Sequence, residues 1–333
     1  MSSLSKYLAR LWFLLFLVAA SWQTVTMAQS RRPFYTREIS LVSDNDYLSI
    51  EDYYYTAGQD ILYRRLVQPN SGLHKFLKPR GGSDSSKIIV GYHYGVKIFT
   101  PYDIVQTNAA KFDRPYAGWN FGNITFSNFP SMRRSNQYQL EMGLVGPVSG
   151  MERLQRWIHE LTHYTLPKGW QYQIPNELVV NVYYARLQNW RLTNDLDIVS
   201  ESAVQAGTGS NKVSQSLTMR LIQFNDIGNS VFTNSRLSWD SRSQGRGRQF
   251  EFFFFFGAGV QYVVSNIFIE GSLFSNSNSQ FTAQHEPWVL TRKYGLMFSK
   301  HDISWSVTFH HLSKEVKVGE SHNYASLALS VRF

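Results

Sequence analysis

Hydrophobic and polar side chains alternate along many stretches of this chain, as they do in β-strands that have one apolar and one polar face. The alternation is clearest at residues 90–98, where valine, tyrosine and isoleucine alternate with glycine, histidine and lysine, and again at 138–144. Every second residue from 327 to 333 is also apolar. Such an alternation at the C-terminus is typical of the last strand of an outer-membrane barrel, whose strands touch lipid on one face only.

About twelve stretches carry this pattern over roughly ten residues each, the length that a tilted strand needs to cross a bilayer. They run approximately over 36–45, 57–66, 87–99, 117–128, 137–147, 177–190, 195–206, 215–225, 250–263, 290–300, 303–312 and 322–333. An even number of strands keeps both ends of the barrel chain in the periplasm. The sequence therefore predicts an all-β fold, a transmembrane antiparallel β-barrel of about 12 strands in a single domain over residues 29–333.

Two segments depart from the alternation. Residues 252–256 are all phenylalanine, so we expect the inward-facing members to pack against another element inside the barrel. Residues 225–249 form a long polar connection rich in serine and arginine. Strand parity assigns this connection to the periplasmic side, where turns are usually short, so it is the least regular part of the predicted topology.

Residues 151–163 predict a helix within a loop. Their apolar residues recur at helical spacing and are Leu154, Trp157, Ile158 and Leu161. Counted from a periplasmic N-terminus, the loop after the fifth strand is extracellular, and so is the loop between the first two strands. We therefore expect the helix to lie over the same rim as residues 45–56.

The N-terminus has the form of a secretory signal peptide. Lys6 and Arg10 precede the apolar run 11–20, and small residues follow up to Ala28. The apolar run is about half of the roughly 20 residues that a membrane helix needs, and a membrane anchor is the alternative. The prediction is a signal peptide over residues 1–28 and export to the bacterial outer membrane.

Composition narrows the chemistry. The chain has no cysteine, which excludes disulfides, thiolate nucleophiles and cysteine-zinc sites. Lys and Arg number 33 against 24 Asp and Glu, and a basic excess suits a surface that meets anionic lipid phosphates. The basic residues are scattered, so we expect no nucleic-acid partner. Aromatic residues make up 15% of the chain, which suits the aromatic girdles of a membrane barrel.

Three separated motifs carry a family resemblance. The first is Asp44-Asn45-Asp46 followed by Tyr55-Thr56-Ala57-Gly58, the second is Asp113-Arg-Pro-Tyr-Ala-Gly-Trp119, and the third runs from Gly146-Pro147 through Gln155 and His159 to Lys168-Gly169-Trp170. In this order, over about residues 37–190, they resemble the outer-membrane lipid A 3′-O-deacylase family (LpxR-like). The last strand also ends as strands of that family do.

The resemblance implies a twelve-stranded barrel that hydrolyses the ester-linked 3′ acyl chains of lipid A, with calcium, in the outer leaflet. The functional positions that it implies are Asn45, Asp46, Thr56 and His159. An imidazole is a suitable general base near neutral pH. Oxygens of Asn45, Asp46 and Thr56 suit Ca²⁺, which would stabilise the developing oxyanion at the extracellular rim. The expected partner is lipopolysaccharide, and the barrel is expected to be a monomer.

The sequence departs from the family at one position. Where a carboxylate is expected shortly after the catalytic histidine, an ungapped count gives Thr165, and Glu160 is the nearest acidic residue. Three basic residues are candidates to bind the phosphates of lipid A, namely Arg114, Lys111 and Lys168. The alternative for Arg114 is a loop ion pair beside a turn.

Other interpretations of the same residues stay open. Asn45 and Asp46 are common turn formers at strand ends, Thr56 suits an ordinary strand, and His159 suits a packed helix face. His159 to His163 also spell H-E-x-x-H, the zinc-protease signature, which makes Zn²⁺ and a protease the minority alternative.

Two further function classes remain. One is an outer-membrane phospholipase that uses an unrecognised serine. The other is a non-catalytic pore, although a twelve-stranded barrel is narrower than an open porin. Inward-facing Lys97, Glu141 and His93 are expected to fill its lumen.

Overall fold

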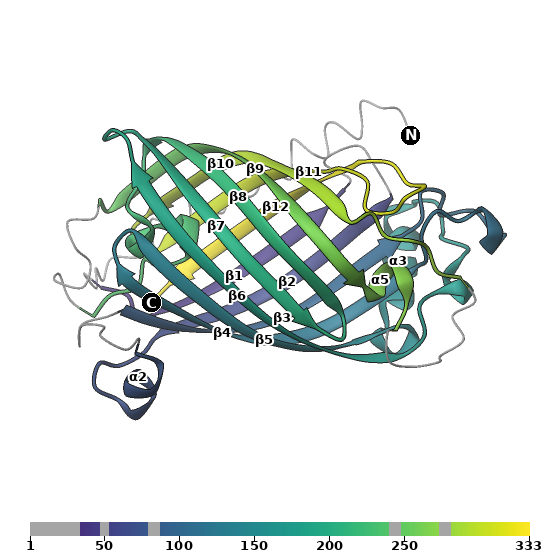
Figure 1. Ribbon diagram of the computed structural model, residues 1–333, viewed down its shortest axis with the longest axis horizontal. Helices are drawn as coiled ribbons and strands as arrows, with labels where there is room; N and C mark the ends of the chain where they lie inside the picture. Colours follow the sequence, from purple (N-terminus) through teal and green to yellow (C-terminus); the bar gives the residue numbers. More distant parts are fainter. Residues whose placement is uncertain (1–33, 47–52, 79–86, 240–247, 273–280) are drawn as a thin grey trace.

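A computed structural model describes residues 34–46, 53–78, 87–239, 248–272 and 281–333, and in these residues twelve antiparallel strands close into one barrel (Figure 1). Each strand pairs with the next along the chain, and β1 pairs with β12. The predicted fold is therefore confirmed. The predicted signal peptide, residues 1–28, lies outside the described residues.

Every predicted strand overlaps an observed one. The strands are β1 (Arg37–Asn45), β2 (Tyr54–Leu66), β3 (Lys87–Thr100), β4 (Ala117–Ser131), β5 (Arg134–Val145), β6 (Glu177–Arg191), β7 (Leu196–Gly207), β8 (Ser210–Gln223), β9 (Phe250–Asn266), β10 (Trp288–Lys300), β11 (Ile303–Leu312) and β12 (His322–Arg332). The helices are α2 (Gly72–Leu77), α3 (Met151–Thr162) and α5 (Ile267–Glu270), with short 3-10 turns between strands. None of the helices that the structure describes is long and apolar enough to cross a membrane.

Pairing of β1 with β12 brings the two ends of the barrel chain together. The backbone amides of Thr36 and Arg37 donate to the carbonyl of Phe333, at 3.2 and 3.0 Å. The hydroxyls of Ser40 and Ser330 lie 2.7 Å apart across the same seam. We call the end of the barrel that contains these residues the terminal end, and the opposite end, at the right of Figure 1, the distal end.

Side chains alternate between the lumen and the outer wall, as the sequence predicts. On β1, Ser40 is buried and Leu41 is 54% exposed. On β9, Phe253 and Phe255 are buried against Phe224 and Val231 inside the barrel. The expected internal packing of the phenylalanine run is therefore confirmed.

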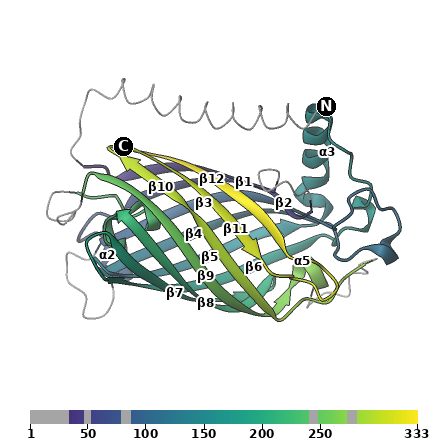
Figure 2. The same ribbon diagram turned by 90° about the horizontal axis from the view of Figure 1, so that it is seen from above.

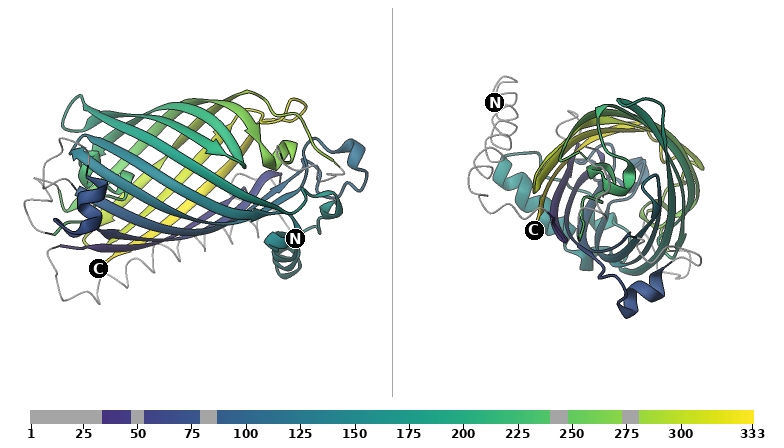
Figure 3. Two further views of the ribbon diagram at one scale, coloured as in Figure 1. Left: turned by 60° about the horizontal axis from the view of Figure 1, so that its bottom comes forward. Right: turned by 90° about the vertical axis from the view of Figure 1, so that its left-hand side faces the viewer.

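The long connection 225–249 belongs to the terminal end, as strand parity predicts, and much of it lies inside the barrel. Residues 224–239, which we call the lumen plug, form two short 3-10 turns within the ring of strands (Figure 3, right). The carboxylate of Glu251 accepts hydrogen bonds from the plug at 2.8 to 3.0 Å. Buried Arg220 pairs with Asp197 at 2.6 Å and also donates to the plug.

The rest of the lumen is occupied by bonded side chains. His93 lies 2.7 Å from Asp60, and Asn181 donates to Glu141 at 2.9 Å. The Lys97 ammonium lies within 5.9 Å of three aromatic ring centres. At the distal end, α5 packs Phe268 against Trp119. The three predicted residues Lys97, Glu141 and His93 thus occupy the lumen, as the sequence predicts, although a cavity remains beside Lys293 and His310.

Candidate functional site

The first part of the site lies where β1 and β2 meet at the distal end. Asn45 is the last residue of β1 and is opposite Ala57 on β2. The amide of Asp46 donates to the carbonyl of Thr56 at 3.3 Å. A register shift in β2 at Thr56 disturbs its pairing with β3, and the Thr56 hydroxyl lies 2.9 Å from that of Thr100. The structure therefore brings Asn45, Asp46 and Thr56 together.

Of the three side chains at this corner, that of Asn45 faces the outside of the barrel. The carboxylate of Asp44 points inward, where it accepts hydrogen bonds from Tyr55 at 2.7 Å and Ser326 at 2.6 Å. Because neighbouring residues of a strand face opposite sides, the side chain of Asn45 is on the outer wall. Asp46 and Thr56 are buried beside it, 2% and 5% exposed, so Asn45 is the most accessible of the three side chains.

The predicted helix is present as α3, and it stands outside the ring of strands at the distal end (Figure 2). It packs against β3 and β4, so only β2 lies between its base and β1. Gly118 on β4 makes this approach possible, because a Cβ atom there would lie 2.5 Å from both the Met151 Cβ and the Ser149 Oγ. Any larger residue at 118 would displace the start of α3.

The second sequence motif forms the support beneath this helix. Buried Tyr116 packs with Phe112, Ile98, Met151 and Trp170. Its hydroxyl donates to the carbonyl of residue 104, and its own carbonyl accepts from the amide of residue 174, both at 2.9 Å. These bonds tie the loop after β3 to the loop after β5. The Asp113–Trp119 motif thus positions α3.

The two faces of α3 are used in an unusual way. Its buried residues are Met151, Gln155 and His159, spaced four apart on one face. Two residues of the predicted apolar stripe, Trp157 and Leu161, are instead 60% and 66% exposed. A helix of a soluble protein usually buries its apolar face, whereas α3 buries the polar Gln155 and His159 behind Met151 and exposes two of its largest apolar side chains.

His159 is held in one tautomer. Its side chain is buried, and Nδ1 lies 2.6 Å from the backbone carbonyl of Thr165. A carbonyl only accepts hydrogen bonds, so Nδ1 must carry the proton and the lone pair is on Nε2. The Thr165 position, where a carboxylate is expected, therefore orients the imidazole through its backbone.

Gln155 is a functional candidate to which sequence analysis assigned no role. Its Oε1 accepts a hydrogen bond from the Trp170 indole at 2.8 Å. Its buried Nε2 has no hydrogen-bond partner in the part of the chain that the structure describes. It lies one turn before His159 on the same face, and that i, i+4 spacing was the available signal.

The three predicted phosphate-binding residues occupy different environments. Lys111 and Lys168 are exposed on the loops after β3 and β5. Arg114 is only 1% exposed and lies 3.4 Å from the Glu315 carboxylate. Burial lowers the pKa of Arg114, and the Glu315 charge opposes that shift. A phosphate would have to compete with Glu315 for Arg114.

The metal candidates differ in their donor chemistry. His163 follows the end of α3 in a left-handed conformation, φ 56°, and both it and Glu160 are exposed. Within the described ranges, no three His, Cys, Asp or Glu residues gather into a group that could hold a metal ion. Asn45, Asp46 and Thr56 offer an amide, a carboxylate and a hydroxyl oxygen, the hard donors that Ca²⁺ accepts.

Comparisons with known proteins agree with the barrel fold. A family model described as "Outer membrane protein LpxR" matches residues 11–333. The solved structure of LpxR from Salmonella typhimurium is similar with a TM-score of 0.69 at 14% identity, covering 89% of this chain and 100% of that chain. The β domain of the Bordetella autotransporter Brka gives a TM-score of 0.43 at 7% identity, covering 90% of this chain and 98% of its own. No curated protein matches the chain.

Proposed function

Because the chain belongs to the LpxR family of outer membrane proteins, we propose that it is a lipid A 3′-O-deacylase that hydrolyses the ester-linked 3′ acyl chains in the outer leaflet. The observation that carries this proposal is the tautomer of His159, whose Nδ1 is bonded to a carbonyl at 2.6 Å. This hydrogen bond leaves Nε2 as a base. The proposal also covers the site, the calcium ion and the phosphate contacts described below.

The placement of the site suits a substrate that resides in the membrane. In outer-membrane barrels the long loops are extracellular and the outer wall meets lipid, so the distal end is assigned to the outer leaflet. The exposed Trp157 and Leu161 of α3 would contact acyl chains there, as amphipathic helices do at an interface. A lipid can then reach the Asn45 corner without leaving the leaflet.

The proposed reaction is a water attack on the ester. His159 Nε2 takes a proton from water while the water oxygen bonds to the ester carbonyl carbon. The buried Nε2–H of Gln155 and the hydroxyl of Thr56 are assigned to the oxyanion. The intermediate then expels the 3′ oxygen of the sugar, which takes the proton back from His159. The products are a fatty acid and a free 3′ hydroxyl.

A calcium ion would fit the oxygen donors of Asn45, Asp46 and Thr56, and when bound it would supply positive charge for the oxyanion. Lys111 and Lys168, which are exposed on neighbouring loops, are assigned to the lipid A phosphates. Arg114 is proposed for the same role only if a phosphate displaces Glu315.

The test is mass spectrometry of lipid A after incubation with the purified barrel and calcium, beside a sample with chelator. We expect loss of the 3′-linked acyl mass only where calcium is present. Phospholipid in the same micelles is the control substrate and should stay intact. Lipid A that stays unchanged with a folded barrel would refute the proposal, and cleaved phospholipid would favour the phospholipase alternative.

A further inference from the structure

Polar side chains that lie directly opposite one another on β10, β11 and β12 form a row across the outer wall in the distal half of the barrel, which we call the rung. Arg292 on β10 is directly opposite His311 on β11, and His311 is opposite Asn323 on β12. Their chain neighbours Lys293 and His310 line a cavity inside the lumen. Because strand residues alternate in direction, Arg292 and His311 face outward.

The guanidinium of Arg292 lacks a protein partner. Arg292 is exposed, and within the residues that the structure describes it makes no hydrogen bond or ion pair. Its neighbours on the same face of β10 are Leu290 and Tyr294, which are also exposed. An unpaired positive charge among apolar groups on a lipid-facing wall is destabilising, and the cost falls when an anion pairs with it.

A hydrogen bond to Asn323 fixes the orientation of the His311 ring. Its Nδ1 lies 2.8 Å from Oδ1 of Asn323, and an amide oxygen only accepts, so Nδ1 carries the proton. The other ring nitrogen, Nε2, remains for a ligand. When protonated, Nε2 donates a hydrogen bond to an anion beside Arg292.

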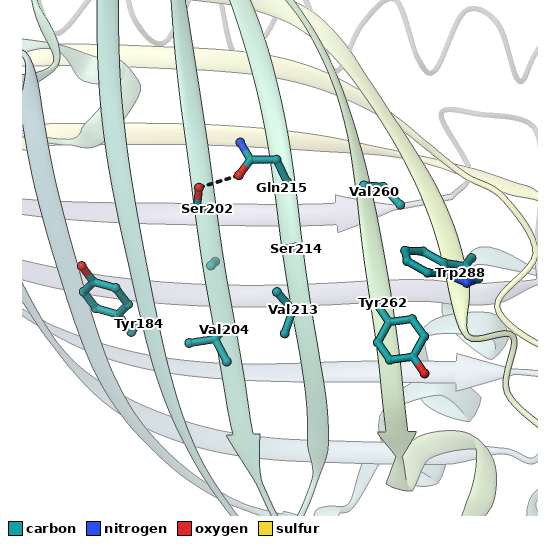
Figure 4. A pocket seen from close by; sticks show the side chains of 10 residues that line it. Tyr184, Ser202, Val204, Val213, Ser214, Gln215, Val260, Tyr262 and Trp288 are labelled. Carbon is teal, nitrogen blue, oxygen red and sulfur yellow. Dashed lines mark hydrogen bonds between the residues drawn. The ribbon is translucent and has the colours of Figure 1, made fainter.

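Two other polar pairs on the outer wall satisfy one another. Gln59 donates to Ser43 at 2.8 Å. On the far wall, Ser202 on β7 is hydrogen-bonded to Gln215 on β8, next to the cross-strand pair of Val204 and Val213 (Figure 4). These pairs need no ligand, whereas the rung of Arg292 and His311 presents a guanidinium and an imidazole outward.

We propose that Arg292 and His311 form an anion-binding subsite on the outer wall that holds a phosphate group of a lipid A molecule. A guanidinium matches the oxygens of a phosphate with two parallel hydrogen bonds. Three strand spacings of about 4.8 Å separate β10 from β1, or roughly 14 Å. One lipid can therefore contact the subsite and the Asn45 corner together. The subsite rests on the proposed function for the identity of the lipid only, because binding requires no hydrolysis.

The test measures binding without turnover. Full-length His159→Gln protein in detergent is titrated with lipid A, with dephosphorylated lipid A and with phosphatidylglycerol, and bound lipid is counted by native mass spectrometry. Arg292→Gln in this background should weaken lipid A binding about tenfold, the usual worth of one charge-assisted contact. Binding of dephosphorylated lipid A should not change.

The matched control is Arg186→Gln. Arg186 is exposed on the outer face of β6, opposite Asn136 and Ser202, with no histidine across from it. It should leave lipid A affinity unchanged. Equal losses for both forms of lipid A, or from both arginine variants, would overturn the subsite. Losses confined to phosphatidylglycerol would overturn its assignment to lipid A.

A second variant separates binding from folding. Arg292→Leu should fold and be at least as stable in vesicles, because it removes an unpaired charge from the lipid face. A misfolded Arg292→Leu barrel would mean a structural role and would overturn the proposal. If native protein hydrolyses no lipid A but binding still depends on Arg292, the proposed function fails and the subsite stands.

Discussion

At the terminal end, the carboxylate of Glu251 accepts three hydrogen bonds from the lumen plug, whereas at the distal end the buried Nε2 of Gln155 has none among the described residues. Both groups are removed from water, so both were costly to bury. At the terminal end, hydrogen bonds from the plug offset the cost of burying the Glu251 carboxylate. At the distal end, the Gln155 Nε2 lies on the same helix face as His159, where a bound substrate would accept its hydrogen bond.

This contrast assigns stability to one end and chemistry to the other. The buried pair of Arg220 and Asp197 at 2.6 Å belongs to a network that fixes the plug. Among the described residues, the His159 ring makes its one hydrogen bond through Nδ1. Variants at the terminal end should therefore change unfolding, and variants at the distal end should change turnover.

The largest effect is expected from His159→Gln. Glutamine can still donate to the Thr165 carbonyl but cannot act as a base, so turnover should fall by about 10² to 10⁴. The measurement is the rate of release of the 3′ acyl chain, with heat-modifiable gel migration as the test of folding. His163→Gln is the control, because His163 is exposed beyond the end of α3. A strong loss in the control would favour the zinc protease instead.

Asp197→Asn tests the other end. The change leaves the buried guanidinium of Arg220 without its counter-charge, which typically costs about 3–5 kcal/mol. Unfolding in urea should shift by that amount, while the activity of the folded protein stays the same. Glu286→Gln is the matched control, since Glu286 lies outside the plug and 3.8 Å from Lys314, a partner that is half exposed. An unchanged midpoint for Asp197→Asn would remove the stability role of the plug network.

Gln155→Glu tests the hydrogen-bond donor at the distal end. Glutamate keeps an oxygen that accepts from the Trp170 indole but loses the amide donor, and one oxyanion donor is typically worth about 10² in turnover. We expect kcat to fall by about that factor, with a smaller change in KM and a preserved melting temperature. Loss of stability without loss of kcat would make Gln155 a packing residue only.

The smallest effect is expected from Gly118→Ala. The new methyl group would lie 2.5 Å from the Met151 Cβ, so α3 must move away from the barrel wall. A displaced base should lower turnover about tenfold while the barrel stays folded. Gly122→Ala, on the same strand face, is the control because its nearest neighbour would be a carbonyl at 3.5 Å, an ordinary contact. Equal rates for the two variants would contradict the role of Gly118.

The barrel was readable from the sequence because alternation is local. Each strand shows its lipid face by itself, as Leu41 beside Ser40 does. The lumen plug was not readable, since residues 225–249 have no period and are held by groups far along the chain. Only the inward packing of the phenylalanine run indicated that something occupied the lumen.

The site was partly readable for the same reason. Asn45, Asp46 and Thr56 meet because β1 and β2 are neighbours with a short connection. The orientation of His159 could not be predicted, because the group that orients it is the backbone carbonyl of Thr165, and every residue has a carbonyl. The partner of Arg114 also lay beyond sequence reasoning, since Glu315 comes 201 residues later.

The seam between β1 and β12 has a consequence for how the chain is made. The hydroxyls of Ser40 and Ser330, 290 residues apart in sequence, meet across it. The first strand of the barrel can therefore complete its pairing only after the last strand has been synthesised. Until β12 arrives, β1 is an open edge, and a bilayer contains no water to bond its backbone. Membrane insertion and ring closure must therefore be one event. A chain that ends before β12 could not close the barrel at all, so only a chain translated through β12 would insert.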